Sequence, residues 1–381
     1  MRPAASSHRA SKDKAASFIE LFFDLVFVFS VTQVVGLLHG HITAQLVGQA
    51  VLVFWLVWWA WTQFTWALNA ADATHTYIEL AVLVATGVTF FMAVALPGAF
   101  SESALGFALA YTAVRAIGLG VYSWVAWVDD GQRSAVCRFT GASLLGLCAV
   151  LAGGMLGGAA QYWCWGLAVA LDVLAALIGG RAEGWNLFPE HFVERHGLFV
   201  IIALGESMIV AANGVARGGW DNDVLVVASL AVATTCALWW TYFVRAKPAL
   251  AHAMEHRQFA AQSTFARDAF SLMHFPMLLG VIAFAVAIEH MLAHPQAALH
   301  LETTAALALG VALFLGGMAL ALRRGTGAWP KARVALCLLS AAAILGLTGR
   351  PPVAALCAAL VGTLALCVVE QRVPYRSAPR A

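Results

Sequence analysis

The sequence predicts an all-α polytopic membrane protein with about 12 transmembrane helices, and three observations lead to this fold class. Hydrophobic residues make up 61% of the chain. Charged residues make up only 11%, compared with roughly 25% in soluble domains. The apolar residues gather in long runs of about 20, the length that a helix needs to cross the hydrocarbon core. Membrane lipids are therefore the expected surroundings of the chain.

Each predicted helix corresponds to one apolar run. The first run carries Glu20 and Asp24, which are four residues apart and therefore share one face of a helix. Arg115 lies in the fourth run, glycines are frequent in the fifth, and Asp172 lies in the sixth. A GRPP turn alone separates the last two runs. The predicted spans are 17–38, 45–67, 77–96, 104–127, 135–156, 161–178, 197–216, 222–244, 268–292, 303–322, 332–348 and 352–370.

A weak internal repeat divides these spans into two sets of six. Asp24 precedes the Trp58 and Trp59 pair by 34 residues, and Glu206 precedes the Trp239 and Trp240 pair by 33. This spacing predicts two parallel six-helix halves, although tryptophans also gather at membrane interfaces without any repeat. The predicted organisation is an N-terminal tail (1–16), a first half (17–178), a linker (179–196), a second half (197–370) and a C-terminal tail (371–381).

The basic residues predict how the chain is oriented. With the N-terminus inside, 19 of the 22 Lys and Arg residues fall in cytoplasmic segments, Arg195 and Arg333 among them. Only Arg217 and Arg350 fall outside, and Arg115 lies within a span. Since cytoplasmic loops are enriched in Lys and Arg, both tails and the linker are predicted to be cytoplasmic.

Several classes of function lack support in the sequence. A net charge of +2 without a basic stripe predicts no nucleic-acid partner. The seven cysteines are scattered singly, so neither a disulfide framework nor a zinc site is expected. His39 and His41, or His290 and His294, could contribute metal ligands, but no zinc-site motif accompanies them. No nucleotide-binding or hydrolase motif is present, and the sequence predicts no cofactor and no metal.

Charged residues inside the predicted spans are the candidate site. Asp24, Asp172 and Glu206 lie well inside helices, Glu20 lies within about one turn of the cytoplasmic interface, and Arg115 is near the middle of its span. Buried charges in a membrane usually pair or mark an ion or substrate path. One arginine leaves acids in excess, which predicts an ion, proton or substrate site rather than packing alone.

Backbone features near these acids add secondary candidates. Gly205 and Ser207 flank Glu206 in the seventh span, and Pro276 follows His274 in the ninth. Glycine and proline interruptions of this kind line cavities in transporters, although kinks also serve packing.

Three long stretches resemble the bacterial low temperature requirement protein A (LtrA) family: the opening span, ERHGLFVIIALGESMIVAANG (194–214) and RDAFSLMHFPMLLGVIAFAVAIEH (267–290). The resemblance covers roughly residues 15–370. It implies a polytopic protein of the bacterial inner membrane that is linked by name to growth in the cold. It implies no agreed catalytic residues.

The leading functional interpretation is a secondary transporter or permease that uses the buried carboxylates as a proton or cation site for an unidentified small molecule or ion. The alternatives are an intramembrane enzyme or lipid-handling protein, in which the acids perform acid–base chemistry, and a non-catalytic membrane stress protein. Catalysis is the less favoured interpretation. Uptake into proteoliposomes would indicate transport, whereas altered lipids in a deletion strain would indicate chemistry.

Overall fold

A computed structural model describes residues 15–40, 42–71, 73–128, 130–179 and 187–372. These ranges are helical without any strand, which confirms the all-α prediction. Residues 1–14, 180–186 and 373–381, which hold most of both predicted tails and part of the linker, lie outside the described residues, as does His41. The principal helices are α1 (Phe18–Leu37), α2 (Ala44–Ala70), α3 (Thr76–Ala95), α4 (Ala104–Val128), α5 (Asp130–Leu156), α6 (Gly158–Gly179), α7 (Pro189–Gly218), α8 (Asn222–Trp240), α9 (Lys247–Glu255), α10 (Phe259–Phe265), α11 (His274–Ala293), α12 (Leu301–Thr326), α13 (Lys331–Leu345) and α14 (Pro352–Arg372).

Two of the long helices contain wider, π-helical turns. The segment η2 (Thr241–Ala246) joins α8 to α9, and η3 (Ala266–Leu272) joins α10 to α11. With these joined helices counted once, the described chain has twelve helices, of which eleven are long and apolar enough to cross a membrane. The remaining helix is α13, whose 15 residues span only about 22 Å.

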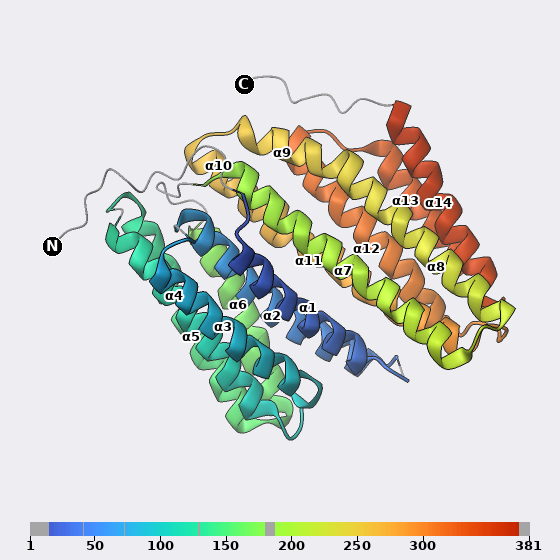
Figure 1. The fold of residues 1–381 in the computed structure, drawn as a ribbon, viewed down its shortest axis with the longest axis horizontal. Helices are drawn as coiled ribbons and strands as arrows, with labels where there is room; N and C mark the ends of the chain where they lie inside the picture. Colours follow the sequence, from blue (N-terminus) through green and yellow to red (C-terminus); the bar gives the residue numbers. More distant parts are fainter. Residues whose placement is uncertain (1–14, 41, 72, 129, 180–186, 373–381) are drawn as a thin grey trace. The chain divides into compact units, whose positions relative to one another are not determined.

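The chain divides into two compact units. The first comprises Met1–Gln33, Val51–His196 and Met254–Arg267, and the second comprises Val34–Ala50, Gly197–Ala253 and Asp268–Ala381. Within the first unit, α3, α4, α5 and α6 pack side by side in chain order (Figure 1). Within the second, α11, α12, α13 and α14 do the same, and α14 also packs against α8 (Figure 1). The parallel repeat between halves stays a prediction.

The outer surface of the helices differs from that of a soluble protein. Large apolar side chains are exposed, including Phe91 (67%), Trp127 (82%) and Trp163 (81%). The largest fully buried side chains include the arginines Arg115 and Arg195. Because soluble domains expose charges and bury apolar groups, this pattern fits helices whose outer surface faces lipid.

The helix boundaries correct two predictions. α7 begins at Pro189, eight residues before the predicted start at 197, and it continues without a break past Gly205. Arg195, which was expected in a cytoplasmic linker, is therefore a helical residue. Pro276 lies in the first turn of α11, directly after the π-helical turns of η3 and the turn residue Met273, so the regular α-helical hydrogen bonding of the predicted span 268–292 is interrupted just before it.

Glycines allow close helix contacts in the first unit. A Cβ atom on Gly154 of α5 would lie 2.5 Å from Ala108 Cβ of α4, and one on Gly153 would lie 2.5 Å from a ring atom of Trp165 of α6. Only glycine permits this approach. The following turn to α6 needs positive φ at Gly157 (64°) and Gly158 (54°), which glycine adopts without strain.

Candidate functional site

The first unit contains a buried ionic cluster built around Arg195 of α7. Its Nη1 donates to Glu20 Oε1 at 2.6 Å, while Nε and Nη2 donate to the two oxygens of Asp24 at 3.1 and 2.5 Å. All three side chains are fully buried. Glu20 is buried although it lies in the first turn of α1. We call Glu20, Asp24, His191 and Arg195 the Arg195 cluster.

Glu20 also closes the N-terminus of α1. Its Oε2 accepts hydrogen bonds from the backbone N–H and the hydroxyl of Ser17, both at 2.8 Å. The sequence Ser17-Phe-Ile-Glu20 has the spacing of a capping box, and its glutamate half is present, in which the carboxylate accepts from the Ser17 backbone N–H. Since the positive end of a helix dipole favours an anion, this position stabilises Glu20 as a carboxylate.

Asn69 of α2 sets the protonation of His191. Its Oδ1 accepts from the backbone N–H of Phe188 at 2.9 Å, and its Nδ2 donates to the Phe188 carbonyl at 3.0 Å. This pairing fixes the amide orientation, so Nδ2 also donates to His191 Nδ1 at 3.0 Å. His191 is therefore neutral and carries its proton on Nε2, which donates to Glu20 at 3.0 Å.

With His191 neutral, the Arg195 cluster holds two carboxylates and one guanidinium. Its charge is −1 without an added proton and zero with one. Glu20 already accepts from Ser17, His191 and Arg195, whereas Asp24 Oδ2 accepts only from Arg195 Nε among the described residues. Asp24 Oδ1 accepts from Arg195 and from the indole N–H of Trp61, at 2.7 Å. Asp24 Oδ2 therefore has the fewest hydrogen-bond donors of the four carboxylate oxygens and is the most available to bind a proton.

A second ionic cluster in the first unit joins α4 to α6. Arg115 donates from Nη1 and Nη2 to Asp172 Oδ1 at 3.3 and 3.2 Å, and from Nη1 to the Tyr111 hydroxyl at 2.6 Å. Arg115 lies about 16 Å from the start of α4, and its side chain is fully buried. Tyr111, Arg115 and Asp172 form the Arg115 cluster.

Arg115 therefore pairs with Asp172, one of the acids that the sequence suggested, while Asp24 pairs with Arg195. The second buried cation of this unit, Arg195, was not expected from the sequence.

The tryptophans of α2 contact both clusters of the first unit. Trp61 bonds to Asp24, and its ring lies 5.8 Å from the Arg195 guanidinium carbon. Trp55 and Trp59 stack with ring centroids 5.4 Å apart, and their indoles approach Asp172. Of the two tryptophan pairs that suggested a repeat, Trp58 and Trp59 are buried, whereas Trp239 and Trp240 are exposed.

The second unit contains its own buried pair. Arg333 of α13 donates from Nε and Nη2 to the two oxygens of Glu370 at 2.8 and 2.7 Å, and from Nη2 to the Thr241 carbonyl in η2 at 3.1 Å. Arg333 is fully buried, although it was predicted to lie in a cytoplasmic loop. Such bidentate pairs have strict geometry, so the pair fixes α13 against α14.

The remaining predicted candidates also lie in the second unit. Glu206 and Ser207 are buried in the middle of α7, at 2% and 1% exposure. His274 donates from Nδ1 to the Ala269 carbonyl at 2.8 Å, and its Nε2 shares a hydrogen bond with the Tyr242 hydroxyl at 2.8 Å. These bonds connect η2 to η3 through His274.

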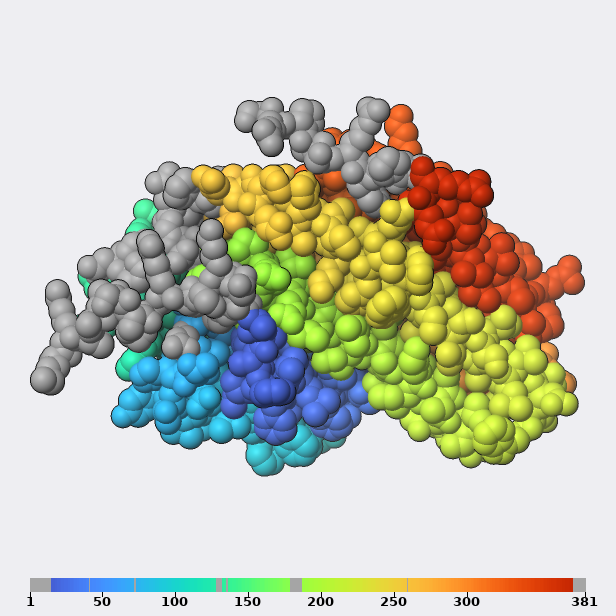
Figure 2. All heavy atoms as spheres, turned by 45° about the horizontal axis from the view of Figure 1, so that its top comes forward, coloured from blue at the N-terminus to red at the C-terminus, as the bar shows by residue number. Residues whose placement is uncertain are grey.

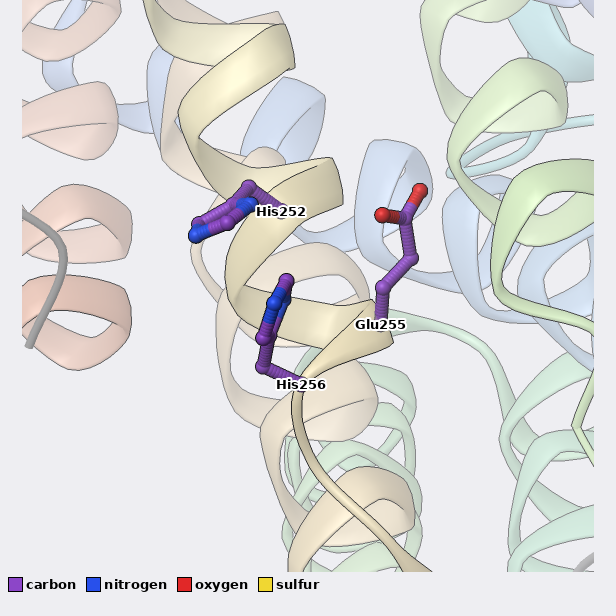
Figure 3. A group of neighbouring side chains, drawn as sticks. All are labelled: His252, Glu255 and His256. Atoms are coloured by element: carbon purple, nitrogen blue, oxygen red, sulfur yellow. The ribbon is translucent and has the colours of Figure 1, made fainter. Parts of the chain in front are cut away.

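A surface group offers the ligand types of a metal site. His252, Glu255 and His256 have ligand atoms within 4.8 Å of one another (Figure 3). They lie at the end of α9, a segment on the viewed face of the space-filling view (Figure 2, yellow). Because all three are exposed, water competes for any ion, and such groups are common without a metal. His39, which the sequence analysis considered as a possible metal ligand, pairs with Glu289 at 2.7 Å.

Sequence reasoning missed Arg195, His191, Asn69 and Trp61. Arg195 was present in the quoted stretch 194–214, but it preceded the apolar run and was counted with the loop residues. The readable signal was the pair Glu20 and Asp24, because two acids on one face of an apolar helix need a cation nearby.

The fold and these clusters define a multi-pass helical membrane protein with ionic networks buried between its helices. The family model described as bacterial low temperature requirement A protein (LtrA) matches residues 15–369, and the chain belongs to this family. An uncharacterized protein of Rhizobium meliloti (strain 1021) is 30% identical over 290 residues, covering 74% of this chain and 70% of that protein. No solved structure matches the chain.

Proposed function

We propose that this LtrA-family protein is a secondary transporter or permease of the bacterial plasma membrane, and that the Arg195 cluster is its proton site. One observation carries the proposal: two fully buried carboxylates, Glu20 and Asp24, share one guanidinium between membrane-spanning helices. Buried acids in membrane proteins commonly form proton relays and ion pathways.

The excess acid gives the cluster two states of different charge. When Asp24 is ionised, the cluster carries one uncompensated negative charge, which burial opposes. A proton on Asp24 Oδ2 removes that charge while Oδ1 continues to accept from Trp61 and Arg195. Glu20 is held as a carboxylate by its four donor atoms, so it serves as the fixed anion of the cluster.

Replacing Asp24 with asparagine tests the proposal because the asparagine side chain is a permanently uncharged mimic of the protonated acid. The variant should fold, since Glu20 still neutralises Arg195. Its infrared spectrum should lose a pH-dependent carboxylic acid band that the native protein shows. In proteoliposomes containing a pH-sensitive dye, solute gradients should drive proton movement with the native protein and not with the Asp24→Asn variant.

Glu194→Gln is the matched control. Glu194 is on the same turn of α7 as Arg195, is partly exposed, and accepts a hydrogen bond from Ala16 N at 3.0 Å outside the cluster. This variant should keep the infrared band and the proton movement. A folded Asp24→Asn protein that retains both signals would refute the assignment of the proton to Asp24.

A further inference from the structure

The last turn of α9 presents three ligand-type side chains on one exposed face. Glu255 and His256 follow His252 by three and four residues, the spacing that places side chains together on a helix. Their ligand atoms lie within 4.8 Å of one another (Figure 3). All three residues are exposed, whereas Ala253 and Met254 between them are buried. The helix therefore packs through its apolar face and keeps the three polar groups on the surface.

The length of the helix places this face in water. The joined helix Asn222–Glu255 has 34 residues and is about 50 Å long, whereas the hydrocarbon core is about 30 Å thick. Its last turns therefore extend beyond the core. Lys247 and Arg257 flank the three side chains, and basic segments of this kind are predicted to lie on the cytoplasmic side. A dissolved metal ion can reach such a position.

Hydrogen bonds hold the backbone at the end of α9 while the three side chains stay adjustable. Gln262 Nε2 donates to the carbonyls of Met254 and Arg257 at 3.3 and 3.2 Å, and the backbone N–H of Arg257 donates to the Met254 carbonyl at 3.2 Å. In a tetrahedral zinc site the ligand atoms are about 3.3 Å apart, given metal–ligand distances of about 2.0 to 2.1 Å. Small side-chain rotations at Glu255 and His256 would close the remaining distance.

The ligand types select the class of metal ion. Imidazole nitrogens favour Zn²⁺ and the neighbouring ions Ni²⁺ and Cu²⁺, and two histidines with one glutamate are an established zinc ligand set. Mg²⁺ and Ca²⁺ require about six or more oxygen ligands, and only Glu255 supplies oxygen here. The C-terminal end of a helix also favours a cation, because the helix dipole is negative there.

We propose that His252, Glu255 and His256 bind one divalent transition-metal ion of the Zn²⁺ type, with water in the remaining coordination position. Because water competes at this exposed surface, the ion exchanges with the solution. The site is separate from the Arg195 cluster, and the inference does not depend on transport.

Zinc binding to the full-length protein tests this site. The detergent-solubilised protein, purified with a tag that lacks histidine, competes for ZnCl₂ with a chromophoric chelator. His252→Asn and His256→Asn should each weaken Zn²⁺ binding at least about 10-fold, because loss of a residue that merely supports a ligand already costs about 10- to 100-fold. Glu255→Gln should also weaken it. His300→Asn is the matched control, since His300 is exposed at the start of α12, and should bind Zn²⁺ as the native protein does.

Electron paramagnetic resonance identifies the ligands independently of affinity. With one equivalent of CuCl₂, the native protein and His300→Asn should show hyperfine splitting from two imidazole nitrogens. His252→Asn and His256→Asn should each show splitting from one. Thermal melting of every variant establishes that it is folded, and these substitutions of exposed side chains should leave the melting temperature without metal unchanged.

Four results would overturn the inference. The first is a native protein that binds no more Zn²⁺ than protein-free micelles do. The second is unchanged Zn²⁺ affinity in folded His252→Asn and His256→Asn proteins, which would place the ion elsewhere. Unchanged affinity in Glu255→Gln would refute the three-ligand assignment. Displacement of Zn²⁺ by excess MgCl₂ would refute the class of metal. None of these measurements depends on Asp24, so they leave the test of the proton site independent.

Discussion

Replacing Arg195 with glutamine removes the only guanidinium of the Arg195 cluster and leaves Glu20 and Asp24 buried together. Arg195 makes three charge-assisted hydrogen bonds to these acids, at 2.6, 3.1 and 2.5 Å. At about 1.5 to 3 kcal/mol each, they set an upper range of about 4.5 to 9 kcal/mol. The acids recover part of this by binding a proton, so the expected loss of stability is about 3 to 5 kcal/mol, as for other broken buried pairs.

Intrinsic tryptophan fluorescence during heating of the detergent-solubilised protein measures this loss. Arg195→Gln should lower the melting temperature by at least about 5 °C. Arg195→Lys should melt between the native protein and Arg195→Gln, because lysine keeps the charge but not the forked geometry. Arg217→Gln is the control on the same helix, since Arg217 is 62% exposed and its surface ion pair contributes little. An Arg195→Gln protein that melts like the native protein would show that the cluster contributes little to stability. It would refute the expectation that Glu20 and Asp24 need the charge of Arg195 in order to stay buried.

Three further changes test the packing and the caps. Ser17→Ala removes the hydroxyl that donates to the Glu20 carboxylate and should cost about 1.5 to 3 kcal/mol by thermal melting; no measurable change would mean that the backbone N–H bond to Glu20 suffices. Glu370→Gln leaves the buried Arg333 without a carboxylate and should cost about 3 to 5 kcal/mol, so a fully stable variant would contradict the bidentate geometry. Gly154→Ala places a Cβ 2.5 Å from Ala108 Cβ and should cost about 1 to 3 kcal/mol; native-like expression and melting would show that α4 and α5 separate easily.

The helices could be predicted from the sequence because a membrane-spanning segment must be long and continuously apolar. That requirement located most of the predicted spans close to their observed helices. It failed at α7, because Arg195 and its neighbours are polar yet continue the helix in the protein interior. The same requirement placed the end of α13 too late, at residue 348. The residues after Leu345 are apolar, but they form turns before Gly349.

The candidate acids were also readable, since a charge within an apolar run is unusual wherever it occurs. Glu20, Asp24, Asp172 and Glu206 are all buried, as such residues must be in lipid. Their partners were not readable, because pairing depends on which helices pack together. Glu20 is 175 positions from Arg195 in the chain, and Arg115 is 57 from Asp172. Sequence spacing carries no information on contacts at such separations.

The placement of tryptophans on α2 connects the two clusters of the first unit. Successive residues on a helix turn by about 100°, so Trp59 and Trp61 point in nearly opposite directions. Trp61 contacts Asp24, and Trp59 approaches Asp172. The Arg195 cluster is supplied by α1 and α7 and the Arg115 cluster by α4 and α6, so α2 is the element that contacts both. In the proposed proton site, protonation of Asp24 would weaken the acceptor of the Trp61 N–H, and a change at Trp61 would reach Trp59 through the shared helix α2.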